Sequence, residues 1–292
     1  GKLIVNKKQY GPSWFTSEKT TIKPNVFTIE PNGKTLNEVI SEAKDGDIIE
    51  LVQGTYSFNK PLAINKQLVI KSKDASSIAS IKYTGPKESP LFEMNPKGNL
   101  ILKHISLSGK NNYAFATLKE NMSSAYNLSL SNSVITGFDF ILKSYKGSFA
   151  DSVQFKNVSF NNCSSGIVLA AEIDDKGDYN AEFLSFENCV FENIKKDVIN
   201  FYRGGYDEST IGGNLLIKNS SFKNCGVSDK SNYLIKNRGI INVDIIGNSF
   251  VNNPVNVVSL LWGEKNNFQS ENKIINSGKI ITEEYLKQKL VY

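Results

Sequence analysis

The sequence is poor in the residues that most catalytic and metal sites use. Its 292 residues include one histidine, two arginines and three cysteines. Because a Ser–His–Asp catalytic triad needs a histidine, such a triad is possible only at His104. Three cysteines are too few for a disulfide scaffold and match no metal-binding spacing, so we expect Cys163, Cys189 and Cys225 to be small buried side chains. No apolar run approaches the roughly 18 residues of a membrane span, and no block of basic residues favours nucleic acid.

What the sequence does contain is a repeat. Residues 219–225 (NSSFKNC) recur as 188–194 (NCVFENI) and 157–163 (NVSFNNC), each with phenylalanine in fourth place. Weaker copies centre on Leu107, Ile135, Phe250 and Ile275, and successive centres are 25 to 31 residues apart. A period in this range is typical of solenoids, and its variation indicates loops on a stacked framework.

Each centre is preceded by the alternation of a half-buried strand. The residues seven and five positions before it are apolar, as Leu215 and Ile217 are before Phe222. Because no crossover helices separate these strands, each must pair with its equivalent in the next coil. We therefore predict an all-β fold, a single-stranded right-handed parallel β-helix over residues 26–292, with residues 1–25 as an extension or linker. A capping box at 35–38 and a helical start at 282–286 predict a short capping helix at each end.

Asparagine recurs three positions before and two positions after the centres. Equivalent residues of adjacent coils lie ~4.8 Å apart, so we expect these amides to hydrogen-bond along the stack and to adopt left-handed turns. His104 takes the asparagine position of its own coil. We therefore interpret His104 as a turn residue and not as a catalytic base.

A second strand follows each centre, and aligning these strands predicts a column at their ends. Its members are Tyr145, Glu172, Arg203, Arg238 and Trp262. Two guanidinium groups in adjacent coils would repel by roughly 3 kcal/mol at an effective dielectric of 20. A bound carboxylate or sulfate would offset this repulsion, and Tyr202 and Tyr206 would add flat faces for sugar rings. A solvated row of arginine and glutamate is the alternative interpretation.

Two insertions near this column are acidic. They carry Asp174, Asp175, Asp178, Asp207 and Glu208. Clustered oxygen ligands suit Ca²⁺, but the spacing matches no EF-hand, and solvated acidic loops explain the same pattern.

Residues 45–51 (DGDIIEL) with 54–56 (GTY) resemble the opening coil of pectin-lyase-like β-helices. Residues 202–213 (YRGGYDESTIGG) resemble a motif in the C-terminal β-helix of two-domain alginate lyases, the chondroitinase-B-like enzymes of polysaccharide lyase family six. Residues 10–15 (YGPSWF) resemble the join that precedes that domain. The resemblance implies that catalysis, with a lysine base, an arginine acid and calcium, belongs to an N-terminal β-helix. No stretch of this chain matches that catalytic motif.

The resemblance thus implies a bacterial protein that is secreted, periplasmic or at the cell surface. We favour a β-helix that binds an acidic polysaccharide of alginate-type uronates, as the accessory partner of an N-terminal catalytic β-helix. The alternatives are a β-eliminating lyase and a structural or adhesive β-helix without a glycan site. Elimination needs a neutralised carboxylate, a base and an acid. The candidates for these roles are Tyr202, Arg203, Lys236 and Arg238.

Overall fold

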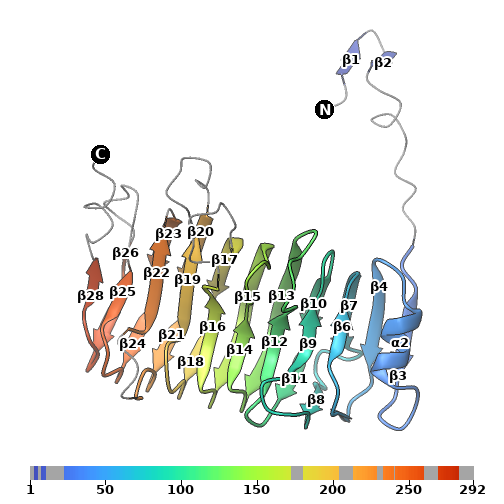
Figure 1. The fold of residues 1–292 in the computed structure, drawn as a ribbon, viewed down its shortest axis with the longest axis horizontal. Helices are drawn as coiled ribbons and strands as arrows, with labels where there is room; N and C mark the ends of the chain where they lie inside the picture. Colours follow the sequence, from blue (N-terminus) through green and yellow to red (C-terminus); the bar gives the residue numbers. More distant parts are fainter. Residues whose placement is uncertain are drawn as a thin grey trace.

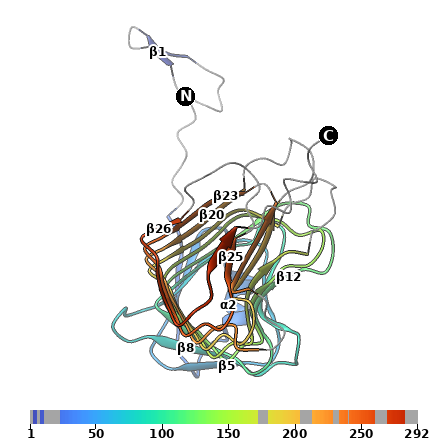
Figure 2. The same cartoon turned by 90° about the vertical axis from the view of Figure 1, so that its left-hand side faces the viewer.

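The computed structural model describes residues 23–171, 180–203, 213–228, 233–239, 241–259 and 269–282. It also describes two short antiparallel strands, β1 (Leu3–Val5) and β2 (Lys8–Tyr10). From β3 onward the strands wind into a right-handed parallel β-helix, whose coils succeed one another along the long axis from β4 to β28 (Figure 1). Seen along that axis, the strands of successive coils lie over one another (Figure 2). The predicted fold class is confirmed. No helix in the described part of the chain has the length and apolarity that crossing a membrane requires.

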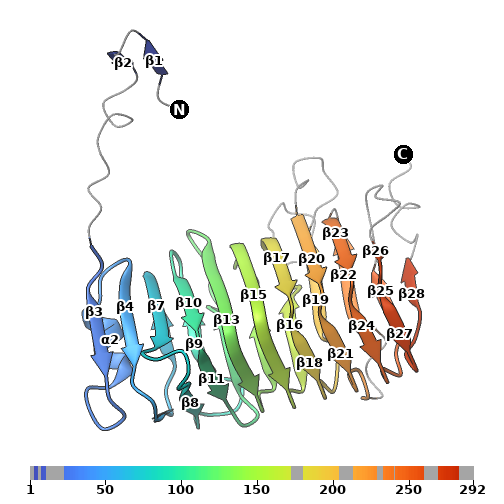
Figure 3. The same cartoon turned by 180° about the vertical axis from the view of Figure 1, so that it is seen from behind.

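Each coil contributes strands to three faces. The first face consists of β3 (Val26–Ile29), β4 (Asp47–Leu51), β7 (Gln67–Ser72), β10 (Asn99–Lys103), β13 (Tyr126–Thr136), β15 (Ala150–Asn161), β17 (Ala181–Glu187), β20 (Gly213–Lys218), β23 (Ile241–Ile246) and β26 (Gln269–Ser270). The second consists of β5 (Thr55–Phe58), β8 (Ala79–Tyr83), β11 (Ile105–Ser108), β18 (Val190–Glu192), β21 (Ser221–Lys223), β24 (Ser249–Val251) and β27 (Lys273–Ile275). The long strands β13 and β15 run through both faces (Figure 3).

The third face is a separate seven-stranded parallel sheet. It consists of β6 (Leu62–Ile64), β9 (Pro90–Met94), β12 (Tyr113–Thr117), β14 (Phe140–Lys143), β16 (Ser165–Leu169), β19 (Ile199–Arg203) and β22 (Ile235–Gly239). Two further strands, β25 (Val257–Ser259) and β28 (Ile280–Thr282), pair with each other in parallel.

The predicted N-terminal cap is the helix α2 (Leu36–Glu42), which is confirmed. Thr35 Oγ1 accepts from the Glu38 amide at 3.3 Å, while the Thr35 amide donates to Glu38 Oε2 at 2.7 Å, which completes the capping box. The first strand comes earlier than we predicted, because β3 precedes α2 and pairs with β4. Only Ile29 of β3 is buried, so its alternation is weak in the sequence. The predicted C-terminal helix lies beyond Thr282, outside the described residues.

The interior holds the predicted row of phenylalanines. The rings of Phe160, Phe191, Phe222 and Phe250 are stacked at centroid distances of 4.6, 4.8 and 4.8 Å. The continuation of the row differs from the prediction, because Phe250 pairs with Ile274 and not with Ile275. A shift of one residue moves a side chain to the opposite face of its strand.

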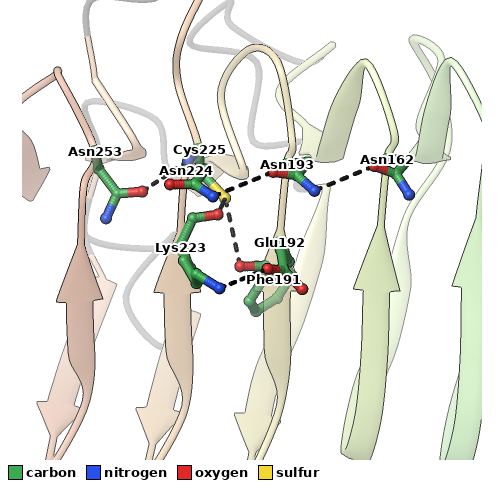
Figure 4. A network of polar contacts seen from close by, with 8 residues as sticks. All are labelled: Asn162, Phe191, Glu192, Asn193, Lys223, Asn224, Cys225 and Asn253. Atoms are coloured by element: carbon green, nitrogen blue, oxygen red, sulfur yellow. Dashed lines mark hydrogen bonds and ion pairs between the residues drawn. The ribbon is translucent and has the colours of Figure 1, made fainter.

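Asparagines make the turns of the coils, and their side chains bond between coils. Asn157 and Asn193 have φ of 54° and 58°, in the left-handed region that asparagine tolerates. Asn157 Nδ2 donates to Asn132 Oδ1 at 2.9 Å, and Asn193 Nδ2 donates to Asn162 Oδ1 at 3.2 Å (Figure 4). His104 has φ of 54°, and its Nε2 lies 3.2 Å from Asn132 Nδ2, as a turn residue in this position requires.

Asn272 differs from the expected turn position and points inward. Its Oδ1 accepts from the backbone amide of Asn248 at 2.9 Å, and its Nδ2 donates to the Ile245 carbonyl at 2.8 Å. Glu271 takes the turn instead, with φ of 57°. The one-residue shift that displaced Ile275 from the phenylalanine row accounts for this difference as well.

The three cysteines are free and buried, as predicted. Burial raises the pKa of Cys163 and Cys189 to about 11. Both thiols therefore stay protonated and unreactive near neutral pH.

Candidate functional site

The third face presents two kinds of column along the stack. Its inward positions are apolar and buried, as Phe115, Leu142 and Ile167 are. The facing outward positions form a column that we call the outward column: Glu93, Ala116, Lys143, Val168, Asn200 and Lys236. Neighbouring members are ~4.8 Å apart along the helix axis, and all of them except the buried Ala116 are partly exposed.

Lys143 lies among aromatic rings. Its Nζ is 5.1 Å from the ring centroid of Tyr113, 4.8 Å from that of Phe140 and 5.4 Å from that of Tyr145. Tyr113 and Phe140 meet edge to face at 5.1 Å. Cation–π attraction to several rings holds an ammonium group without a carboxylate partner. We call Tyr113, Phe140, Lys143 and Tyr145 the Lys143 cluster.

The backbone around Tyr145 is fixed by two buried hydroxyls. The Tyr145 amide donates to Thr117 Oγ1 at 2.8 Å, and Thr117 Oγ1 donates to Ser148 Oγ at 2.9 Å. Lys119 Nζ lies 5.3 Å from the centroid of the Tyr145 ring. The ring of Tyr145 is thus held in one place between two cations, Lys119 and Lys143.

The two phenols of the Lys143 cluster, Tyr113 and Tyr145, are protonated near neutral pH. Burial raises the pKa of Tyr113, and the nearby Tyr145, Glu88 and Asp139 raise it further. Burial, followed by Glu88, also raises the pKa of Tyr145. Near neutral pH these hydroxyls serve as hydrogen-bond donors and are poor bases.

Further along the outward column lies a second polar group, which consists of Asp197, Asn200 and Lys236. Burial raises the pKa of Asp197, while the charges of Lys236 and Lys196 act in the opposite direction. Asn200 Oδ1 is buried and has no hydrogen-bond partner in the described part of the chain. A buried amide oxygen without a donor is costly to stability.

A cleft of about 230 Å³ opens beside Tyr145. Its walls are Glu88, Pro90, Glu93, Ala116, Thr117, Leu118, Lys119, Glu120 and Tyr145. Three of these side chains are carboxylates and one is a lysine. We call it the Tyr145 cleft. Tyr145 belongs both to this cleft and to the Lys143 cluster, so the two features adjoin.

The predicted arginine column is not aligned as we expected. Arg238 pairs with Tyr202, and Arg203 pairs with Gly239, one residue out of register. The register that we expected, with Arg203 beside Arg238, is therefore wrong by one residue. The insertions beside these strands differ in length, so residues at equal distances from the strand ends do not share a register. Tyr202 lies at this end of β19, where its carbonyl accepts from Asn180 Nδ2 at 2.8 Å.

Other predicted residues are outside the described part of the chain. These are Glu172, Tyr206 and Trp262 of the binding set and Asp174, Asp175, Asp178, Asp207 and Glu208 of the metal set. Among the residues that the structure describes, no group of three or more histidine, cysteine or carboxylate side chains is placed to hold a metal ion.

Tyr145 was among the predicted binding residues, whereas its neighbours Tyr113, Phe140 and Lys143 were not. Phe140 and Lys143 belong to a strand that was predicted, and Tyr113 begins the equivalent strand one coil earlier. A regular pairing of these strands would have indicated the Lys143 cluster.

Comparison with solved structures relates this chain to polysaccharide lyases. It superposes on a mutant of the PL6 family alginate lyase AlyGC with a TM-score of 0.81 and 25% sequence identity, over 94% of this chain and 39% of that one. A second structure of AlyGC gives a TM-score of 0.74 and 22% sequence identity, over 90% of this chain and 38% of that one. The pectate lyase Pel9A gives a TM-score of 0.42 and 15% sequence identity, over 90% of this chain and 78% of that one. No protein-family model and no curated protein matches the sequence.

The structural comparison therefore supports the predicted resemblance to a β-helix of polysaccharide lyase family six. The chain spans about two fifths of the length of the alginate lyase it resembles.

Proposed function

We propose that this chain binds a uronate-containing acidic polysaccharide on its third face. The observation that carries the proposal is the Lys143 cluster, in which an ammonium group lies among three aromatic rings. No carboxylate of the described residues is within ion-pair distance of Lys143. A uronate presents the complement of such a cluster, because its carboxylate suits the ammonium and its ring suits the aromatic faces.

The rest of the outward column supports the same ligand. Lys236 lies three coils from Lys143, ~14 Å along the stack, so the two ammonium groups suit two charges on one chain of sugars. Between them, Asn200 lies in the same outward column.

The likeness to an alginate lyase supports uronates as the class of sugar. Because the chain spans only part of that enzyme, the role we propose is that of an accessory domain, formed by residues 26–292 after a linker. It would act outside the cell beside an N-terminal catalytic β-helix. We propose a Ca²⁺ site only for the acidic insertions around Asp174 and Asp207, which lie outside the described residues.

A second candidate function is β-elimination on the same face. The observation that favours it is Asp197, a carboxyl group whose pKa burial raises, as is common for general bases. Lys236 and Tyr202 lie on the neighbouring strands and would neutralise the carboxylate and protonate the leaving oxygen. Arg203 and Arg238 stay candidates for these roles.

The test is to titrate the protein with oligosaccharides of alginate, pectate and chondroitin sulfate, with and without Ca²⁺, while following absorbance from unsaturated sugar ends. We expect binding without new absorbance. Lys143→Gln should weaken binding about tenfold or more, because a hydrogen bond to a charged group contributes ~1.5–3 kcal/mol. Lys156→Gln removes the same charge from the exposed first face and should change affinity by less than twofold. No binding to any of the three glycans refutes the proposal, and new absorbance favours the lyase.

A further inference from the structure

The Tyr145 cleft differs in charge from the Lys143 cluster that adjoins it. Glu88, Glu93 and Glu120 line it against the single cation of Lys119. Glu93 also stands in the outward column two coils from Lys143, with Ala116 between them. A ligand that runs along this column therefore passes from a cationic position to an anionic one within two coils, ~9.6 Å.

We infer that the Tyr145 cleft takes an uncharged sugar, so that the protein selects glycans in which uronates alternate with neutral sugars over glycans made of uronates alone. This inference rests on the proposed function and narrows its ligand. Three observations support the inference: the volume of the cleft, its charge, and the wall that it shares with the Lys143 cluster.

The walls of the cleft suit a neutral ring. Tyr145 supplies a flat face, and carboxylates are acceptors for the hydroxyl groups of a sugar. Pro90, Ala116 and Leu118 make the remaining wall apolar, which suits an N-acetyl methyl group. A volume of about 230 Å³ is less than that of common ligand pockets and is suited to one sugar unit.

A uronate in the same place meets like charge. Its carboxylate would lie beside three glutamates that one lysine only partly offsets. When one uronate carboxylate is bound at Lys143, a homopolymer cannot avoid this contact, since every following unit carries a charge. An alternating glycan places a neutral unit next to the one at Lys143 and so brings half as many carboxylates past the glutamates.

The experiment compares hyaluronan oligosaccharides, in which glucuronate alternates with N-acetylglucosamine, with oligomannuronates of equal length by calorimetric titration. We expect hyaluronan to bind at least fivefold more tightly although it carries half the charge. Glu93→Gln should raise oligomannuronate affinity about fivefold, which corresponds to ~1 kcal/mol, and hyaluronan affinity less than twofold.

Two further variants separate a local effect from a general one. Because Glu120 is exposed, Glu120→Gln should raise oligomannuronate affinity as Glu93→Gln does, even if the Glu93 variant folds poorly. Glu187→Gln on the first face changes net charge equally and should alter neither affinity. Tighter binding of oligomannuronate in the unmodified protein, with loss on Lys143→Gln, overturns this inference and leaves the proposed function standing. Absence of binding by both glycans overturns both.

Discussion

Lys143 and Tyr113 are joined between adjacent coils, with Lys143 Nζ 3.4 Å from the Tyr113 hydroxyl and 5.1 Å from the centroid of its ring. Tyr113 itself is almost fully buried. The lysine stem thus lies over a fixed aromatic floor, while its charged end stays near the surface. A cation held in this way loses little freedom when it binds an anion, and this preorganisation underlies the proposed glycan site.

The role of the Tyr145 ring can be separated from that of its hydroxyl. We expect Tyr145→Ala to weaken glycan binding about fivefold, because a ring beside two cations contributes ~1 kcal/mol. Tyr145→Phe keeps the ring and should retain affinity within about twofold. Titration with the best-binding oligosaccharide measures both, and circular dichroism checks the fold. Equal losses in the two variants would show that the hydroxyl, and not the ring, makes the contact.

The phenylalanine row should dominate stability. Phe191 is stacked between Phe160 and Phe222 with no exposure, so Phe191→Ala should cost ~3–5 kcal/mol of unfolding free energy. Phe183 belongs to the same chain segment but is 48% exposed. Phe183→Ala should cost ~0.5–1 kcal/mol. Chemical denaturation measures both, and similar losses would contradict the stacked interior.

Tyr126 offers a substitution that we expect to stabilise the protein. Its side chain is fully buried, and its hydroxyl has no hydrogen-bond partner in the described part of the chain. Tyr126→Phe removes an unsatisfied polar group and should raise the unfolding free energy by ~1 kcal/mol. Tyr83→Phe is the matched control, since the buried Tyr83 hydroxyl lies 2.7 Å from Ser89 Oγ, and it should lower stability by a similar amount. If thermal denaturation shows that both variants are destabilised, the Tyr126 hydroxyl is not the unsatisfied group that we describe.

Asp47 should make the N-terminal coil sensitive to acid. The Lys44 amide donates to its carboxylate at 2.7 Å and the Asn25 amide at 2.8 Å, and these bonds, the first above all, lower the pKa of Asp47. Because the folded pKa is below the unfolded value of about 3.9, this stabilisation is present above pH ~4 and is lost as pH falls through the lowered folded pKa.

Asp47→Asn should therefore lower the melting temperature at pH 7 and lower it much less at pH 3. Melting curves of both proteins across this range measure the difference. A constant offset at all pH values would show that the charge of Asp47 makes no contribution. Glu42→Gln, at an exposed position of the same region, controls for the loss of one carboxylate.

The sequence by itself determined the architecture. The repeated phenylalanine centre, the alternation before it and the asparagines around it each report a local requirement: a filled interior, a strand with one buried face and a left-handed turn. Local requirements can be read from one copy of the repeat and checked against the next. For this reason the stack of Phe160, Phe191 and Phe222 and the turn at His104 were predictable.

Only the tertiary structure decided which outward side chains meet. Loops of different length separate the strands of the third face, so the register there depends on how each coil closes and not on the spacing of residues. That register moved Arg203 and Arg238 out of one column and placed Lys143 over Tyr113. A single-residue shift exchanges inward for outward positions, and so the proposed binding face could not be derived from the repeat alone.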